Sequence, residues 1–357
     1  MLSKQFEDFL TLVRLGIGHP SYGVPCNVNW QTTEALAKRH GLSAVILDGI
    51  VGLPENSRPP KRVSLRWIGS VMRFYEQRYE LYYKTIAEMA EWHNVHGYKM
   101  MVLKGLTCSF DWPKPEHRPC GDIDIWQFGK QKEVDALIVK EKNIKIDYTH
   151  HHHTVYRWGG FMVENHFDFL NVYHHKSNVE LEVILKDLGQ DDSHYVELNG
   201  EKVYLPSPNL HALFLLRHSM SNFASTGFKL RQLLDWAFFV KKHKEEIDWK
   251  WLEEVLEKYG MKPLYNIFNA ICVNDLGFDT SLFPTVQFNP SLKDRVLNDI
   301  LAPEFSEKEK GGFLRRAIYK YKRWKANAWK HELCFNESMI SALWSGVWSH
   351  LLKPSSI

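Results

Sequence analysis

The spacing of apolar residues along the first hundred positions is that of helices. Residues 30–40 (WQTTEALAKRH) carry apolar side chains three to four positions apart, and Gly41 follows as a helix stop. A second apolar stretch occupies 43–52 and precedes a proline-rich break at 54–60. Aromatic and charged residues then follow one another over 63–96, in one bent helix or two. The pattern predicts a helical N-terminal region.

The spacing changes to that of strands in the centre of the chain. Residues 99–103 (KMMVL) are a short apolar run that suits a buried strand. Residues 122–126 (DIDIW) alternate acid with hydrophobe, which is the period of a strand with two different faces. A helix is predicted directly afterwards, at 131–142.

Two hairpins are predicted further along this central part. The strand-like runs 149–158 and 161–169 flank a Gly-Gly pair at 159–160, which is a typical hairpin turn. A second, smaller hairpin is indicated by the Asn-Gly pair at 199–200, inside the run 195–205.

From Pro208 onward the pattern is helical almost to the end. We therefore predict an α+β fold, in which a short mixed sheet with flanking helices occupies residues 86–205. Helical regions at 1–85 and 206–357 would pack on this core.

Composition and charge place few further limits on function. The net charge of +3 is small for 357 residues, so it neither requires nor excludes a nucleic-acid partner. The five cysteines form no Cys-x-x-Cys pair, which favours a reducing compartment. The N-terminus carries acids and lacks a long apolar core, unlike a signal peptide, and no run of eighteen apolar residues occurs. We expect a cytoplasmic protein without a transmembrane segment.

The strand at 122–126 carries the candidate chemistry. Asp122 and Asp124 are two residues apart, so they project from the same face of a strand. Two adjacent carboxylates repel each other unless a cation lies between them. Mg²⁺ (or Mn²⁺) prefers such oxygen ligands, usually together with substrate phosphates. The alternative is a strand edge whose acids face water.

Residues around the acidic pair strengthen the metal interpretation. Lys104 and Gly105 follow the predicted buried strand, and a lysine beside a glycine offers positive charge and close backbone approach to a phosphate. Arg118 and Gly121 directly precede the acids.

These residues resemble the signature of a known family. The segment 104–126 with its preceding leucine (LKGLTCSFDWPKPEHRPCGDIDIW) is similar to that of bacterial uncharacterised nucleotidyltransferases, within the polymerase-beta-like superfamily. Weaker similarity extends over roughly residues 1–260. It includes three further stretches: WQTTEALAKRHGLSAVILDGI, VENHFDF and LRHSMSNFASTGFKLRQLLDWAFFV.

The resemblance implies a nucleotidyltransferase-like core and a two-metal reaction. A nucleoside monophosphate would pass from an NTP to an unknown acceptor, which is a small molecule, a protein or an RNA end. Asp122 and Asp124 would hold two Mg²⁺ ions, and a third carboxylate would complete the site. The residues implied for the nucleotide or acceptor are Lys104, Gly105, Arg118, Gly121, His166, His218 and Arg231.

Two segments compete for the third carboxylate. Glu164 lies in the strand-like run 161–169, on one face with His166. Glu180 and Glu182 follow Ser177, which has the spacing of a capping box with Glu180, so they read as water-facing residues of a helix. We therefore predict Glu164 as the metal ligand. The sequence departs from the family at Asn165, where a hydrophobe is usual.

Three further features are open to two interpretations each. The run His150–His153 is a polar strand near the site or a source of one phosphate contact, and a strand would let at most two of its histidines share a site. Arg231 and Asp235 are a structural ion pair, or Arg231 lies near the nucleotide. The segment 313–330 holds seven basic residues among aromatic ones, as a packed helix or as a weak membrane-surface or nucleic-acid contact.

Other classes of function therefore stay open beside the enzyme. The same fold can serve as a catalytically silent nucleotide-binding or interaction module. The basic C-terminal segment would instead suit an RNA- or membrane-surface-associated protein.

Overall fold

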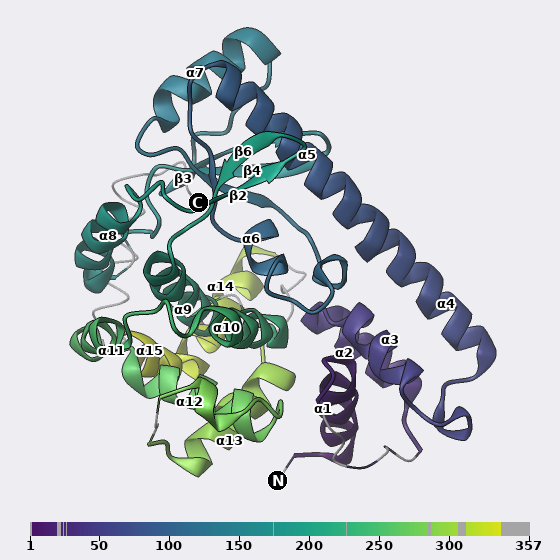
Figure 1. Ribbon diagram of the computed structural model, residues 1–357. Helices are drawn as coiled ribbons and strands as arrows, with labels where there is room; N and C mark the ends of the chain where they lie inside the picture. Colours follow the sequence, from purple (N-terminus) through teal and green to yellow (C-terminus); the bar gives the residue numbers. More distant parts are fainter. Residues whose placement is uncertain are drawn as a thin grey trace. The chain divides into compact units, whose positions relative to one another are not determined.

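The chain divides into two compact units, each described separately. The computed structural model describes residues 2–19, 23, 25, 27–173, 175–225, 227–284, 287–305 and 312–336. The first unit, called the helical unit, takes the described residues up to Val71, then Leu215–Lys244 and those from Trp249 onward. The second, called the sheet unit, takes Met72–Phe214 and Glu245–Asp248. Figure 1 follows the chain through both by colour.

The helical unit contains helices from both ends of the chain. They are α1 (Lys4–Gly16), α2 (Trp30–His40), α3 (Ser43–Val51), α4 (Lys61–Val71), the second part of α9 (Pro208–Ala224), α10 (Leu230–His243), α11 (Trp249–Lys258), α12 (Lys262–Asn274), α13 (Pro290–Leu301), α14 (Phe313–Ala326) and α15 (Ala328–Phe335). The predicted helix at 30–40 is confirmed, and Gly41 ends it in the left-handed region with φ 69°.

Helices α1 and α3 approach each other backbone to backbone. A Cβ added to Gly16 would lie 1.9 Å from the carbonyl oxygen of Val45, and one on Gly49 would lie 2.3 Å from that of Leu12. Only glycine fits at either position, so the two glycines set the distance between these helices.

The segment predicted as one bent helix or two is helical without a break. Helix α4 leads through a π-helical turn at Met72–Glu76 into α5 (Gln77–Val95). Figure 1 shows α5 running past the strands. A π-turn inserts one extra residue per turn, which rotates the apolar face of the following helix.

The sheet unit alternates short strands with helices. Its elements are α5, β1 (Met101–Val102), α6 (Leu106–Ser109), β2 (Ile123–Trp126), α7 (Gln131–Lys142), β3 (His153–Trp158), β4 (Phe161–His166), α8 (Lys176–Leu188), β5 (Tyr195–Leu198), β6 (Glu201–Tyr204) and the first part of α9. Helix α7 and both predicted hairpins are confirmed. Strand β1 is shorter than the predicted 99–103.

The strands form a mixed sheet. Within the described residues the strand order is β3-β4-β2-β1-β6-β5. Strand β2 runs parallel to β4, and β1 runs parallel to β6, whereas the other neighbours are antiparallel. The predicted α+β class, with a mixed sheet and flanking helices, is confirmed.

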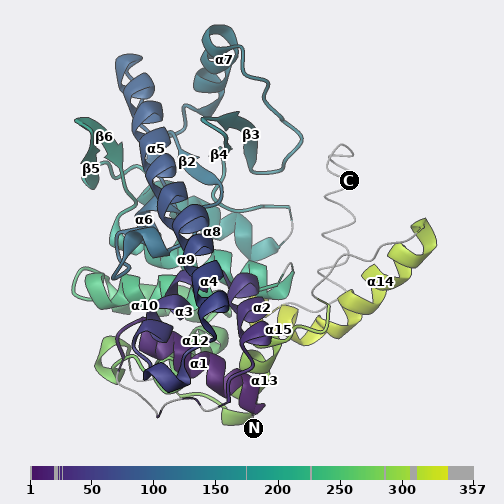
Figure 2. The same cartoon turned by 90° about the vertical axis from the view of Figure 1, so that its right-hand side faces the viewer.

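One face of this sheet carries the core of the unit. Ile123 and Ile125 of β2 and Val163 of β4 are fully buried there, together with apolar residues of α5 and α7. Figure 2 shows α5 alongside the strands. Because successive residues of a strand point to opposite faces, the residues between these hydrophobes point to the other face.

The basic segment 313–330 forms α14 and the start of α15. In this region Ile318 and Tyr321 of α14 are exposed. Trp329 packs against Phe223 and lies 4.0 Å from the Arg295 guanidinium, measured to the ring centre. The side chains of residues 313, 314, 316, 317 and 320 are outside the described part of the chain. A membrane or nucleic-acid contact stays a prediction.

The structure bears on two expectations drawn from composition. None of the helices that it describes is long and apolar enough to cross a membrane. Four cysteines lie in the described part of the chain, and all are buried and free of disulfides. Cys26 lies outside the described residues.

Candidate active site

Two acidic residues face each other across adjacent parallel strands. The register of β2 and β4 places Asp124 opposite Glu164 and Trp126 opposite His166. Asp124 lies between Ile123 and Ile125, which are in the core, so its carboxylate projects from the opposite face of the sheet. The strand prediction for Glu164 is thus confirmed. Its role as a metal ligand stays a prediction.

Lys104 neutralises the buried carboxylate of Asp124. Its Nζ lies 2.7 Å from Oδ1 of Asp124, whose side chain is only 3% exposed. Burial alone would raise the pKa of Asp124, but the ammonium of Lys104 and the ring of His166 hold that pKa well below its usual range. Burial alone would lower the pKa of Lys104. The nearby acids Asp124, Asp122 and Glu164 outweigh burial, so the pKa of Lys104 lies above its usual value. Asp124 is therefore an anion in a dry, positively charged setting.

Glu164 differs from Asp124 in its protonation. Burial, with the negative charge of Asp124 as the next cause, raises the pKa of Glu164 to about 7, against an opposing effect of Lys104. Near neutral pH this carboxyl group is therefore partly protonated. A bound cation would displace that proton, since metal ligands must be deprotonated.

His166 joins the two acids. Its Nδ1 lies 3.1 Å from the carbonyl oxygen of Asp168 and must donate there, because a carbonyl only accepts. Its Nε2 therefore faces Oδ1 of Asp124 at 3.4 Å and Oε2 of Glu164 at 3.9 Å. A backbone carbonyl on the far nitrogen is the usual arrangement for a metal-binding histidine.

The donor atoms present fit a divalent cation. One ligand atom each from Asp124, Glu164 and His166 lies within 4.8 Å of the others. Two carboxylates suit Mg²⁺ or Mn²⁺, and a histidine suits Mn²⁺ better than Mg²⁺. Asp122 lies outside this group in the described residues. It is half-buried, and its charge raises the pKa of both Lys104 and Glu164.

Gly105 and Tyr82 hold the backbone beside the acidic pair. The hydroxyl of Tyr82 donates a hydrogen bond of 2.9 Å to the carbonyl oxygen of Asp122. Gly105 has φ 64°, and a Cβ there would lie 2.1 Å from this hydroxyl oxygen. The glycine therefore makes room for the tyrosine. The sequence offered no signal for Tyr82, because its partners are distant along the chain.

Arg118 and Gly121 lie on the segment that leads into β2. Arg118 is 4% exposed, and its charge lowers the pKa of the buried Tyr82, which burial raises well above the usual value. Gly121 is exposed, and a Cβ there would meet open space. Their contact with a triphosphate stays a prediction.

The competing glutamates lie on α8, and one of them corrects the sequence reading. Glu180 is exposed, as predicted. Glu182 is only 5% exposed and accepts hydrogen bonds from the backbone N–H groups of Phe169 and Leu170, at 3.0 and 2.9 Å. The prediction that both face water was wrong for Glu182, which ties the segment after β4 to α8.

The capping-box prediction for α8 was also wrong. The helix begins at Lys176 with His175 as its N-cap, so Ser177 lies inside the first turn. The helical assignment of the segment is nevertheless confirmed.

The histidine run only partly belongs to a strand. Strand β3 begins at His153, which pairs with His166 in the hairpin. His152 precedes the strand, and its ring centre lies 4.3 Å from that of His153. Because His152 lies outside the strand, the alternation of side chains along β3 does not place His152 and His153 on opposite faces. The pairing of His153 with His166 could have been read from the sequence, since both are equally distant from the Gly159-Gly160 turn.

His218 and Arg231 belong to the helical unit. His218 is half-buried on α9, with its Nε2 3.0 Å from Nδ2 of Asn222. Arg231 lies in the first turn of α10 and is half-buried. Their contact with a nucleotide or acceptor, and the ion pair of Arg231 with Asp235, stay predictions.

Comparisons with known proteins bear on this site through the family. Among solved structures, the chain is similar to an antigenic nucleotidyltransferase-like protein from Paracoccidioides brasiliensis, with 17% identity and a TM-score of 0.35, over 49% of this chain and 85% of that one. No curated protein matches the chain. A family model described as uncharacterised nucleotidyltransferase matches residues 27–273, more than half of the 357 residues. The chain therefore belongs to this family of uncharacterised nucleotidyltransferases.

Proposed function

We propose that this protein transfers a nucleoside monophosphate from an NTP to an acceptor hydroxyl or phosphate, with divalent cations held by Asp122, Asp124 and Glu164. The observation that carries the proposal is the register of β2 and β4, which sets Asp124 opposite Glu164 on the face away from the core. Bound Mg²⁺ or Mn²⁺ would supply charge stabilisation to the phosphate oxygens of the NTP.

The chain's own residues divide the remaining work. Lys104, 2.7 Å from Asp124, brings a buried positive charge to the place where a triphosphate would lie. Glu164 would complete one metal site, and its carboxylate would also take the proton of the acceptor. His166 orients both acids from the end of β4.

A second set of residues is proposed for nucleotide binding. Gly105, Arg118 and Gly121 border the segment before β2 and would contact the phosphates. His218 and Arg231 of the helical unit would contact the nucleotide or acceptor, since an arginine fork suits a phosphate.

The first test is binding of NTPs by the full-length protein. Calorimetry in Mg²⁺ or Mn²⁺ should show binding that is lost in EDTA, because the paired acids repel phosphate without a cation. Equal affinity in EDTA would contradict the site.

The second test separates transfer of a nucleotide from transfer of a phosphate. Protein incubated with cell extract should label an acceptor from α-labelled NTP and not from γ-labelled NTP. Label from the γ position alone would indicate a phosphotransferase. Metal-dependent binding without label from either position would favour a catalytically silent module.

A matched pair of variants assigns the third carboxylate. Glu164→Gln keeps the side-chain volume and removes the charge, so metal-dependent NTP binding and transfer should both be lost. Glu180→Gln, at an exposed position of α8, should leave them unchanged. The opposite result would place the third ligand on α8.

A further inference from the structure

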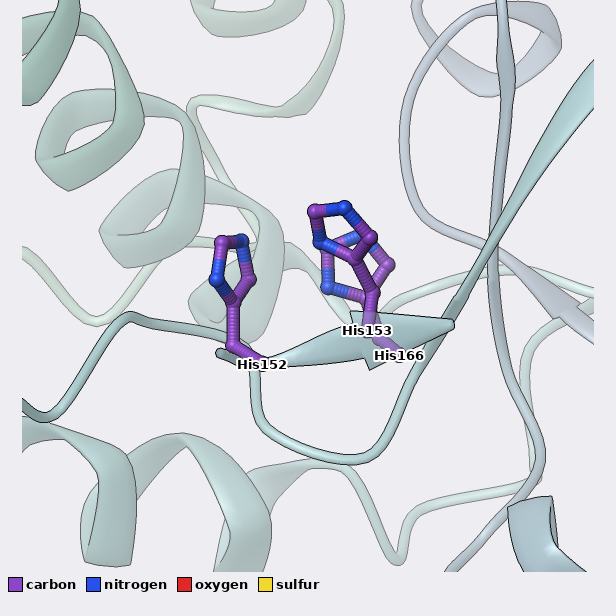
Figure 3. Close-up of side chains that lie close together, drawn as sticks. All are labelled: His152, His153 and His166. Atoms are coloured by element: carbon purple, nitrogen blue, oxygen red, sulfur yellow. The ribbon is translucent and has the colours of Figure 1, made fainter. Parts of the chain in front are cut away.

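Three imidazole rings lie close together at the open end of the β3–β4 hairpin, away from its turn. His152 precedes β3, His153 is its first residue, and His166 is the last residue of β4. The ring centre of His153 lies 4.3 Å from that of His152 and 5.2 Å from that of His166, and the outer two are 5.5 Å apart. Figure 3 shows the three rings standing on the same side of the strand. Strand pairing and chain adjacency thus bring three nitrogen donors together.

The nitrogen atoms are close enough to share one ion. One ring nitrogen of each histidine lies within 4.8 Å of the others. In a tetrahedral zinc site, with Zn–N distances of about 2.0–2.1 Å, neighbouring nitrogens are about 3.3 Å apart. Small side-chain rotations, without a change in strand pairing, would close this difference.

The hydrogen bonds leave nitrogens directed into the cluster. His153 is 7% exposed, and its buried Nδ1 forms no hydrogen bond within the described residues. A buried polar atom without a partner is costly, and an ion would satisfy it. His166 donates from Nδ1 to the carbonyl of Asp168, which leaves Nε2 as its metal-binding nitrogen.

The surroundings favour a positive ion over a neutral ligand. Oε2 of Glu164 lies 3.9 Å from Nδ1 of His153 and 3.9 Å from Nε2 of His166. Asp124 lies 3.4 Å from the same nitrogen of His166. The negative charge of these carboxylates would stabilise a cation bound beside the two rings.

We propose that His152, His153 and His166 form a second cation subsite, which binds Zn²⁺ or a similar imidazole-preferring ion and takes Glu164 as an additional ligand. Imidazole nitrogens select Zn²⁺, Co²⁺ or Ni²⁺ over Mg²⁺, whereas the oxygens of Asp122 and Asp124 favour Mg²⁺ or Mn²⁺. The subsite requires neither a nucleotide nor the transfer reaction, so it goes beyond the proposed function. His166 and Glu164 would make the two cations neighbours.

The test is metal binding by the full-length protein without nucleotide. After removal of metals, Zn²⁺ is titrated in competition with a chromogenic chelator, with excess Mg²⁺ present. We expect one tightly bound Zn²⁺ per chain that Mg²⁺ does not displace. Co²⁺ in place of Zn²⁺ should give the visible absorption bands of a four-coordinate site. Binding that Mg²⁺ abolishes, or no binding, would overturn the proposal.

Variants of the histidine run locate the ion. His152→Ala changes a half-buried residue outside the strands, so the sheet should keep its pairing. Removing a group that only hydrogen-bonds to a metal ligand weakens metal binding by about 10–100-fold. Removing the ligand His152 itself should therefore weaken Zn²⁺ binding by at least about tenfold. The double variant His150→Ala/His151→Ala is the matched control and should bind Zn²⁺ as the unaltered protein does. The reverse pattern would place the ion on the other half of the run and overturn the proposal.

One variant separates this proposal from the proposed function. Asp122→Asn should weaken NTP binding in Mg²⁺ and leave Zn²⁺ binding unchanged. Thermal unfolding without metal checks that each variant is folded. Zn²⁺ binding without any NTP binding would support the subsite and contradict the transferase, and NTP binding without Zn²⁺ binding would do the opposite.

Discussion

At the scale of single residues, the site depends on groups that hold the acids in place. Tyr82 reaches Asp122 only because Gly105 has no side chain, and Lys104 keeps Asp124 charged in a buried position. Neither effect requires a bound ligand, so both can be tested on the protein alone.

Gly105→Ala should destabilise the protein. The new Cβ would lie 2.1 Å from the Tyr82 hydroxyl, in a backbone conformation with φ 64°. Overpacking and left-handed backbone strain each cost about 1–3 kcal/mol. Denaturant unfolding should show a loss of this order. Gly121→Ala is the matched control, because its Cβ would meet open space, and it should change stability by less than about 0.5 kcal/mol. Equal losses would contradict the proposed role of Tyr82.

Binding of Mg²⁺ should strengthen as the pH rises from 6 to 8. The pKa of Glu164 in the folded chain is raised to about 7 by burial and by Asp124. The folded chain thus holds this proton more tightly than the unfolded chain. Protonation of Glu164 therefore stabilises the folded chain. This contribution is fully present below the ordinary pKa of 4.5 and is lost as the pH rises through 7. Because Mg²⁺ must displace the proton, its affinity should rise about tenfold over this range.

Calorimetry in buffers of different ionisation enthalpy would measure that proton release. Glu182→Gln is the control, because burial also raises the pKa of Glu182 to about 7, although it lies outside the metal group. This variant should keep the proton release. Its loss would assign the proton to Glu182 instead.

At the scale of elements, a buried polar network fastens β3 and β4 to α7. The carboxylate of Asp135 on α7 accepts hydrogen bonds of 2.8 Å from both Thr154 of β3 and Asn165 of β4. Asn165 also donates to Gln127 at 3.0 Å, and Gln127 lies 2.8 Å from His93 of α5. Asn165 stands between Glu164 and His166 and points to the opposite face. Asn165, where the family usually has a hydrophobe, therefore forms hydrogen bonds on the core side of the sheet.

Asn165→Leu should weaken the fold even though it restores a hydrophobe. It would leave Oδ1 of Asp135 and Oε1 of Gln127 buried without this donor, at about 1–3 kcal/mol for each unsatisfied group. Chemical denaturation would measure the loss. Arg157→Leu, at an exposed position of β3, is the matched control and should have little effect. An unchanged unfolding free energy for Asn165→Leu would show that the network contributes nothing.

Much of the sheet unit could be predicted because its signals are local. Alternation around Asp122 and Asp124 predicted β2, and the Gly159-Gly160 turn predicted the hairpin that carries Glu164. The network around Asp135 could not be predicted, because its members come from four separate elements and from the residue that follows β2. The burial of Glu182 was missed for the same reason, since its partners are backbone groups outside its own helix.

At the scale of the whole molecule, the chain passes between its two units four times within the described residues, and two of these passages lie inside helices. One passage lies at Val71–Met72, where the backbone stays helical, and another lies within α9 at Phe214–Leu215. The three regions predicted from sequence, divided near 85 and 205, stay a prediction.

Limited proteolysis should not release a stable fragment 1–85. Its cut would fall inside α5, where hydrogen-bonded helical backbone resists proteases, and would separate Tyr82 from Asp122. Mass spectrometry of a digest time course should instead show early cuts in exposed loops. A folded fragment ending near 85 would contradict this picture.

The contact between Lys104 and Asp124 has a consequence for the order in which the protein is assembled. Small zinc domains fold only when their metal is bound, because no preformed site exists without it. Here the chain carries its own counter-charge, 2.7 Å from the acid. We expect synthesis and folding to be complete before any ion arrives, so that the supply of metal governs when the protein becomes active and not how much of it survives.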